Sequence, residues 1–159
     1  MAQHNKKILQ QLEGNWTLAE VIISYKPIQN DHPPIRSQED AEALIRKLWD
    51  NEKIDLQEQF VAIFLNTTNK VIGHRVISTG SMKQCIVDIR LLVSLALHCL
   101  AENVIICHNH PSGNPKVSEQ DVRITHKIKE ALQLIDVKLL DHFIITSTGF
   151  TSLAVEGLL

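Results

Sequence analysis

Apolar residues recur along the chain with two different periods, one typical of strands and one typical of helices. Alternating or wholly apolar runs predict strands over residues 16–27, 58–66, 71–78, 104–107 and 137–146. Apolar residues spaced three or four apart predict helices over residues 37–50, 88–101 and 118–135, and the chain ends in a turn and a short strand or helix. Strands that alternate with helices predict an α/β fold, with a mixed β-sheet flanked by helices.

Two of the predicted strands are apolar on both faces. In residues 58–66 the two alternating sets are Phe60, Ala62 and Phe64 on one side, and Val61, Ile63 and Leu65 on the other. Residues 104–107 read Val-Ile-Ile-Cys, without a polar position. A strand covered on both faces has this pattern, so both strands are predicted to lie at the centre of the sheet.

A serine followed three residues later by an aspartate marks the start of two predicted helices. Ser37 with Asp40, and Ser118 with Asp121, have the spacing of capping boxes, which satisfy main-chain N–H groups at a helix start. The helix from residue 118 is expected to bury one stripe, made of Val122, Thr125, Ile128, Leu132 and Ile135. Its opposite face is expected to meet water with Arg123, Lys127 and Glu130.

The length of 159 residues suits one domain built on a single core. The first 50 residues hold too little apolar material for a core of their own. We therefore expect an N-terminal extension over residues 1–36, with one strand, and a main domain over residues 37–159. The strand at residues 16–27 could pair with the sheet edge of a second copy, which would give a homodimer.

Composition narrows the classes of partner and compartment. The formal net charge of −2 favours neither a nucleic-acid surface nor an anionic membrane partner. No apolar run is long enough to span a bilayer, and residues 1–15 lack the apolar core of a signal peptide. Three cysteines without paired spacing (Cys85, Cys99 and Cys107) indicate a reducing compartment, the cytoplasm.

The stretch CHNHPSGNPKVSEQD, residues 107–121, gathers side chains that bind metal ions. His108 and His110 are two apart in an extended segment, so their side chains point the same way. With Asp121 they form a set that suits zinc and leaves a fourth place for water, which is the pattern of a catalytic site. The same letters also describe a plain turn followed by a capping box, and the residues by themselves leave both interpretations open.

The spacing of this stretch resembles the metal motif of the JAB/MPN (JAMM) metalloprotease-like domains. That motif is an upstream Glu, then His-x-His, seven residues, Ser, two residues and Asp, and it fits His108, His110, Ser118 and Asp121 without a gap. The surrounding motifs are similar to those of the RadC family of bacterial proteins: HNHPSG, a strand that begins Glu-x-Phe and ends Leu-Asn, and a later Leu-Leu-Asp-His-x-Ile-Ile. They stand at residues 108–113, 58–66 and 139–145, and the resemblance covers residues 37–159.

The resemblance implies a JAB/MPN-like fold, layered as in cytidine deaminases, and a zinc-dependent hydrolase that cleaves peptide or isopeptide bonds in a peptide or protein. It implies that His108, His110 and Asp121 hold Zn²⁺. Ser118 would then donate a hydrogen bond to the developing oxyanion, and Glu58 would be the general base. Glu58 shares the face of its strand with two phenylalanines, and burial there would raise its pKa toward neutrality.

Several features leave alternatives open. Asp141 and His142 form a pair typical of the family, which either orients a metal ligand or only packs near the core. Val117 stands where RadC proteins usually have proline, and residues 1–50 show no helix-hairpin-helix pattern of the kind that longer RadC proteins associate with DNA. A DNA-processing or DNA-repair accessory protein, nuclease-like or non-catalytic, is the alternative function, although the charge balance argues against tight phosphate binding.

Overall fold

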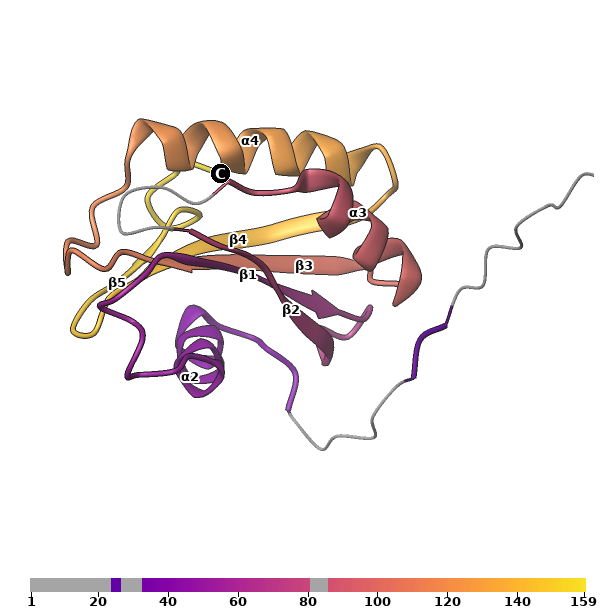
Figure 1. The fold of residues 1–159 in the computed structure, drawn as a ribbon. Coiled ribbons are helices and arrows are strands. Elements are labelled where there is room, and N and C mark those ends of the chain that lie inside the picture. The colour runs from indigo at the N-terminus through magenta and orange to yellow at the C-terminus, as the bar shows by residue number, and fades with distance from the viewer. Residues whose placement is uncertain (1–23, 27–32, 81–85) are drawn as a thin grey trace, which may run out of the picture.

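The computed structural model describes residues 24–26, 33–80 and 86–159, in which a five-stranded sheet lies between helices on both of its faces (Figure 1). The elements follow in the order α2 (Gln38–Leu48), β1 (Gln59–Leu65), β2 (Val71–Thr79), α3 (Ile89–His98), β3 (Asn103–Asn109), α4 (Glu119–Gln133), β4 (Lys138–Ile145) and β5 (Phe150–Ser152). The predicted strand at residues 16–27 lies outside the described residues, except for residues 24–26, which belong to no helix or strand. None of the helices in the described ranges has both the length and the apolar character that crossing a membrane requires.

The sheet has the strand order β2-β1-β3-β4-β5. β3 and β4 are parallel, whereas the other neighbouring strands are antiparallel, so the predicted mixed sheet is confirmed. β1 and β3 both have strands on either side, as their wholly apolar sequences predicted. Because β3 and β4 are parallel, their carboxyl ends reach the same edge of the sheet, where Asn109 pairs with Ile145.

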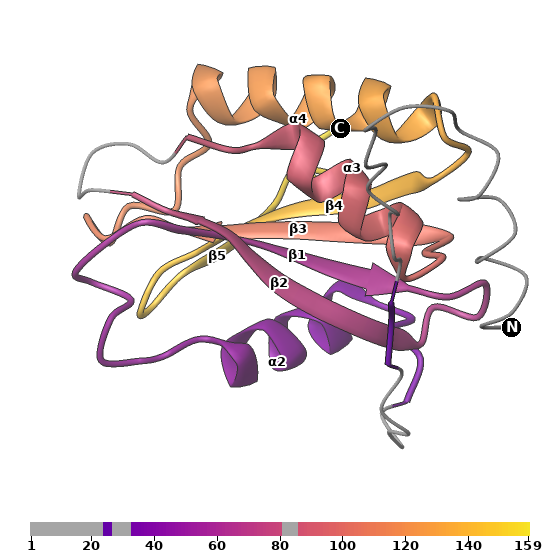
Figure 2. The same ribbon diagram turned by 45° about the vertical axis from the view of Figure 1, so that its right-hand side comes forward.

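Helices cover the two faces of the sheet separately. α3 and α4 lie on one face and α2 lies on the other, in both views of the molecule (Figures 1 and 2). Each face has its own apolar core, and the residues of β1 divide between them as predicted. The core under α3 and α4 takes Phe60, Ala62 and Phe64, and the core over α2 takes Val61, Ile63 and Leu65.

β3 is longer than its apolar run predicted, since it covers Asn103–Asn109 rather than residues 104–107. β1 pairs with β3 as far as His108, and β4 pairs with it as far as Asn109. Partners on both sides therefore extend the strand into the histidine motif. The prediction that both histidines follow the strand is wrong for His108, which lies in it, and holds for His110.

The predicted capping boxes at Ser37 and Ser118 are both present. α3 starts after Asp88 but ends at His98, earlier than predicted, because Leu100 adopts a left-handed backbone conformation with φ 54°. In α4 the buried stripe includes Asp121, which is 8% exposed, in place of Val122. The reason is that the Asp121 carboxylate faces His108.

Candidate metal centre

Three side chains meet where β3 ends and α4 begins. His108 Nε2 lies 2.9 Å from His110 Nε2 and 3.2 Å from Asp121 Oδ1. His110 Nε2 lies 3.7 Å from Asp121 Oδ2. Their candidate ligand atoms all lie within 4.8 Å of one another, so the structure brings together the three residues that the spacing predicted as ligands.

The main chain explains why these side chains converge. His108 and His110 are two residues apart at the end of an extended strand, so both project from the same face of the sheet. The chain then turns at Gly113, whose φ of 75° favours glycine, and Gly113 N donates to His110 O at 3.0 Å. Ser118 caps α4 and places Asp121 in the first helical turn. The turn and the helix cap are thus the means by which the ligands are held.

A main-chain carbonyl determines which nitrogen of His110 faces the cluster. His110 Nδ1 lies 2.8 Å from the carbonyl oxygen of Asn114, and a carbonyl oxygen can only accept a hydrogen bond. Nδ1 therefore carries a proton, and in the neutral ring Nε2 has a free lone pair. That lone pair is directed toward His108 and Asp121, as a metal ligand requires.

A chain of buried groups supports His108 from the other side. His108 Nδ1 lies 2.8 Å from His142 Nε2, and His142 Nδ1 lies 2.6 Å from Thr125 Oγ1. The Thr125 hydroxyl in turn donates to the main-chain oxygen of Asp121 at 2.5 Å. If the Nε2 lone pair of His108 binds a cation, its Nδ1 carries the hydrogen and donates to His142 Nε2. His142 Nδ1–H then donates to Thr125 Oγ1, so every hydrogen in the chain has an acceptor. Burial lowers the pKa of His142 well below its usual value, so the ring is neutral, as this order of protons requires.

Asp121 is held as an anion. Burial raises the pKa of its carboxyl group, but the hydrogen bond and the charge interaction with His108 when its Nε2 carries a proton, and the hydrogen bonds with Ser118, outweigh burial and keep that pKa well below its usual range. A cation bound at Nε2 would take the place of that proton. One of these bonds is donated by Ser118 N to Asp121 Oδ2 at 2.7 Å. A carboxylate in the first turn also lies at the positive end of the helix dipole.

The donor set fits a metal ion in kind and in spacing. Tetrahedral zinc, with ligand atoms about 2.0–2.1 Å away, keeps neighbouring ligand atoms about 3.3 Å apart. The two histidine nitrogens lie 2.9 Å apart, and each has a different oxygen of Asp121 near it, Oδ1 at 3.2 Å from His108 and Oδ2 at 3.7 Å from His110, which is close to that spacing. Two imidazole lone pairs that face each other beside a carboxylate are also stabilised by a cation between them. The cluster of His108, His110 and Asp121 could therefore hold a metal ion.

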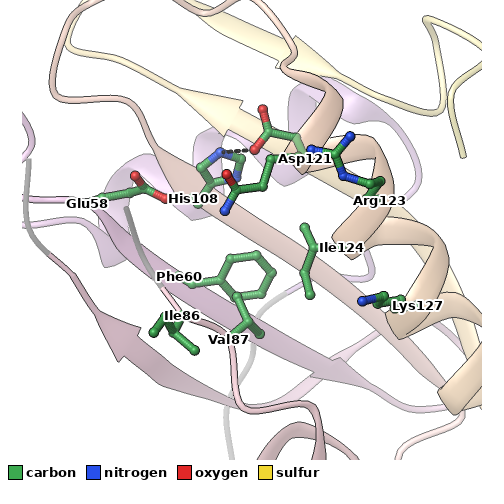
Figure 3. Close-up of a pocket in the computed structure, with 10 residues that line it drawn as sticks. Glu58, Phe60, Ile86, Val87, His108, Asp121, Arg123, Ile124 and Lys127 are labelled. Carbon is green, nitrogen blue, oxygen red and sulfur yellow. Dashed lines mark ion pairs between the residues drawn. The ribbon is translucent and has the colours of Figure 1, made fainter. Parts of the chain in front are cut away.

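An open cleft of about 270 Å³ reaches this cluster, and Glu58 stands at its edge (Figure 3). Glu58 immediately precedes β1 and lines the cleft together with Phe60, two residues later, on the side that strand parity predicted. Burial raises the pKa of Glu58, and the smaller influences of His108 and His110 in the opposite direction do not cancel that shift. A half-buried carboxyl group with a raised pKa thus faces the candidate metal ligands.

Asn109, between the two histidines, has a role that the sequence reasoning missed. Its side chain is fully buried, and its Oδ1 accepts from Gln59 N at 2.7 Å. Its Nδ2 donates to Gln57 O at 2.9 Å and to Ile54 O at 2.6 Å. Asn109 therefore fastens the main chain on both sides of Glu58. The sequence did contain a signal for this role. Asn109 alternates with the two histidines, so its amide lies on the opposite face of a strand buried on both sides and must find hydrogen-bond partners there.

Asp141 and His142 have different roles on opposite faces of β4. His142 contacts His108, as described above, whereas Asp141 points to the other face of β4. There its carboxylate accepts from Ser152 Oγ at 2.5 Å and from Ala154 N at 3.0 Å, which fastens the end of the chain to β4. Cys107 also lies on the far side from the histidines, and burial raises the pKa of its thiol far above the usual value.

The fold and the cluster define a three-layered α/β domain with a His-x-His and aspartate centre at the end of a central strand. Among known protein families, the RadC-like JAB domain matches residues 35–158. This match covers more than three quarters of the chain, so the protein belongs to the RadC-like JAB domain family.

Similar proteins are found in several bacteria. A UPF0758 protein of Flavobacterium johnsoniae is 48% identical over 101 residues, which are 64% of this chain and 44% of that protein. A UPF0758 protein of Neisseria meningitidis is 41% identical over 108 residues, 68% of this chain and 47% of that protein. A UPF0758 protein of Clostridium botulinum is 45% identical over 101 residues, 64% and 44% respectively. The chain thus matches less than half of the length of these curated relatives.

Proposed function

We propose that the protein is a zinc-dependent hydrolase of the JAMM type that cleaves peptide or isopeptide bonds. The observation that carries this proposal is the convergence of three candidate ligands with Glu58 at one open cleft. Ligands alone would make a metal site. Ligands beside a carboxyl group of raised pKa, in a cleft that admits a substrate, are the parts that metal-assisted hydrolysis needs.

Zinc is the metal that the donor set favours. Two imidazole nitrogens and one carboxylate oxygen suit zinc, and three protein ligands leave one position open, as in catalytic zinc sites. Zinc bound there supplies Lewis acidity, which polarises a carbonyl group and makes water a better nucleophile near neutral pH. The hydrogen bonds of His110 with Asn114 and of His108 with His142 keep both ligand nitrogens directed inward.

Glu58 is the general base in this proposal. It takes a proton from the attacking water and passes it to the nitrogen of the leaving amine, so that one water is consumed and one C–N bond is broken. Its raised pKa makes it a stronger base than an exposed glutamate. The hydrogen bonds of Asn109 to the neighbouring main chain hold it in place.

Ser118 assists at the carbonyl oxygen of the substrate. Its Oγ accepts a hydrogen bond from Asp121 N at 3.1 Å, and this bond uses a lone pair of the hydroxyl and not its hydrogen. We propose that the hydrogen is donated to the oxygen on which negative charge develops. Ser118 would then cap α4 and stabilise the oxyanion with the same group.

Hydrolysis of a peptide library tests this function. The zinc-loaded protein is incubated with linear peptides and with lysine-branched isopeptides, and new termini are identified by mass spectrometry. We expect cleavage by the natural chain, and a rate lower by about 100-fold or more for Glu58→Gln at equal zinc content. Equal rates for both proteins, or no cleavage of either kind of bond, would reject the proposal.

The compartment, the oligomeric state and a role on DNA are also open to test. The free thiols of Cys99 and Cys107 suit the cytoplasm, where we propose that the protein acts. A homodimer and a role in DNA processing or repair stay predictions. Light scattering measures the first, and nicking of supercoiled plasmid at low salt with added divalent metal measures a nuclease activity.

A further inference from the structure

The cleft beside the candidate metal ligands has a second half of different chemistry. Near Glu58, His108 and Asp121 its lining carries carboxylates and metal-binding groups. Away from them the lining becomes apolar, with Phe60, Ile86, Val87 and Ile124, and it ends at Lys127, whereas Arg123 lies beside Asp121 (Figure 3). A ligand that fills the whole cleft must therefore match an apolar surface and a positive charge as well as the metal site.

One face of α4 builds the wall of this second half. Arg123 and Ile124 each lie three or four residues after Gln120 and three or four residues before Lys127, so the four residues lie along one side of the helix. The sequence predicted that Arg123 and Lys127 meet open water. Both are exposed, but the structure places them in the cleft wall, where they can meet a bound ligand.

The two cations of this wall are not equivalent. Arg123 Nη1 lies 3.1 Å from Glu119 Oε2, so a neighbouring carboxylate already offsets its charge. Within the part of the chain that the structure describes, no ion pair involves Lys127. In Figure 3 Lys127 lies beyond Ile124, at the end of the cleft away from Glu58. Lys127 is therefore the cation that a ligand can pair with.

The rise per residue of α4 gives the distance between the two ends of the cleft. Asp121 and Lys127 are six residues apart, which corresponds to about 9 Å along the axis at about 1.5 Å per residue. An extended peptide advances about 3.3–3.4 Å per residue, so about two or three residues span that distance. The side chain between them would lie over the apolar surface of Phe60 and Ile124.

We infer that the cleft takes a peptide with a carboxylate two or three residues from the cleaved bond and an apolar side chain in between, and that Lys127 pairs with that carboxylate. The position of the cleaved bond rests on the proposed hydrolase function. An aspartate or glutamate side chain and a free carboxyl terminus offer the same chemistry, and the experiment separates these two sources.

The test uses short peptides with one apolar residue and either Glu or Gln one or two positions from it, each with a free or an amidated carboxyl terminus. Binding is measured by fluorescence anisotropy on the Glu58→Gln variant of the 159-residue chain, and cleavage is measured on the natural chain. We expect the acidic peptides to bind about fivefold more tightly, as one exposed ion pair allows, and to lose this preference in high salt. A preference for Glu over Gln that survives amidation identifies a side-chain carboxylate. Tighter binding of the free than of the amidated peptides, whether they carry Glu or Gln, identifies the chain terminus.

Two charge reversals control the experiment. Lys127→Glu should abolish the preference for acidic peptides and favour peptides with Lys at the same position. Lys138→Glu makes the same change in charge at the first residue of β4, at the opposite end of that strand from the site, and should leave the preference intact. A preference that persists in Lys127→Glu, or no binding of any peptide, overturns the inference.

The two proposals fail in different ways. Peptides that are cleaved without any acidic preference support the hydrolase and overturn the role of Lys127. Peptides that bind with a Lys127-dependent preference but are never cleaved support the role of Lys127 and reject the hydrolase.

Discussion

The carboxamide of Asn109 holds the main chain on both sides of Glu58. Its oxygen accepts from Gln59 N, and its nitrogen donates to Gln57 O, at 2.7 and 2.9 Å. Asn109 lies between the two histidines of the candidate metal centre. The strand that carries two candidate ligands therefore also determines where the proposed base stands.

Replacing Asn109 should impair catalysis without removing the metal. In Asn109→Ala the segment around Glu58 loses its anchor, and a displacement of about 1 Å can lower kcat by about 100-fold. We expect Asn109→Ala to keep its zinc content and lose most of its kcat at temperatures where circular dichroism shows it folded.

Asn103→Ala is the matched control for this change. Asn103 stands at the other end of the same strand, where its Nδ2 donates to Asn69 Oδ1 at 2.8 Å. Asn103→Ala should lower the free energy of unfolding and leave kcat unchanged. Equal kcat values for the two variants would contradict a positioning role of Asn109.

Replacing His142 should weaken metal binding although His142 is not itself a proposed ligand. His142→Leu removes the acceptor of His108 Nδ1–H, and such losses reduce metal affinity by about 10- to 100-fold. His142→Gln retains an oxygen that can accept, so it should recover part of the affinity. Zinc competition with a chromophoric chelator measures both, with the exposed His126→Gln on α4 as control. An unchanged dissociation constant in His142→Leu would speak against the hydrogen-bond chain.

Much of the fold could be predicted because its signals are local. The faces of β1 are distinguished by alternate residues of one strand, and each capping box needs only residues three apart. The end of β3 could not be predicted in this way. It depends on how far β1 and β4 continue beside it, which is a property of the whole sheet.

The site shows the same division between near and distant residues. His108, His110 and Asp121 lie within one stretch of 14 residues, so their spacing can be seen in the sequence, whereas Glu58 was indicated by the family resemblance. The supporting contacts join His108 to His142, 34 residues away, and Asn109 to Gln59, 50 residues away. Strand register and helix packing create these contacts, so no local pattern reveals them.

The pH dependence of the proposed activity should reflect the raised pKa of Glu58. The base form is the carboxylate, so kcat/KM should fall as pH decreases through the pKa of Glu58. Burial raises this pKa, so we expect the fall at a pH above 4.5, the ordinary value for glutamate. Zinc content is measured at every pH, because protonation of the histidines would release metal. A fall only below that ordinary value, or the same pH profile in Glu58→Gln, would exclude Glu58 as the base.

Arg46 should contribute to stability rather than to chemistry. It donates to Thr146 O and Gly149 O, both at 3.2 Å, and so joins α2 to the turn between β4 and β5. We expect Arg46→Met to lower the free energy of unfolding by about 1–2 kcal/mol, as lost hydrogen bonds of a charged group do. Urea unfolding measures this, and Lys47→Met, at an exposed neighbouring position, should change stability far less. Equal losses for the two variants would show that the contacts of Arg46 are not responsible.

Elemental analysis of the purified protein tests the central claim most directly. His108, His110 and Asp121 are proposed to hold one zinc ion, so inductively coupled plasma mass spectrometry should find about one zinc per chain. Asp121→Ala should lose that zinc while circular dichroism shows the fold preserved. A natural chain that neither contains zinc nor takes it up on dialysis, or an Asp121→Ala variant that retains it in full, would contradict the claim.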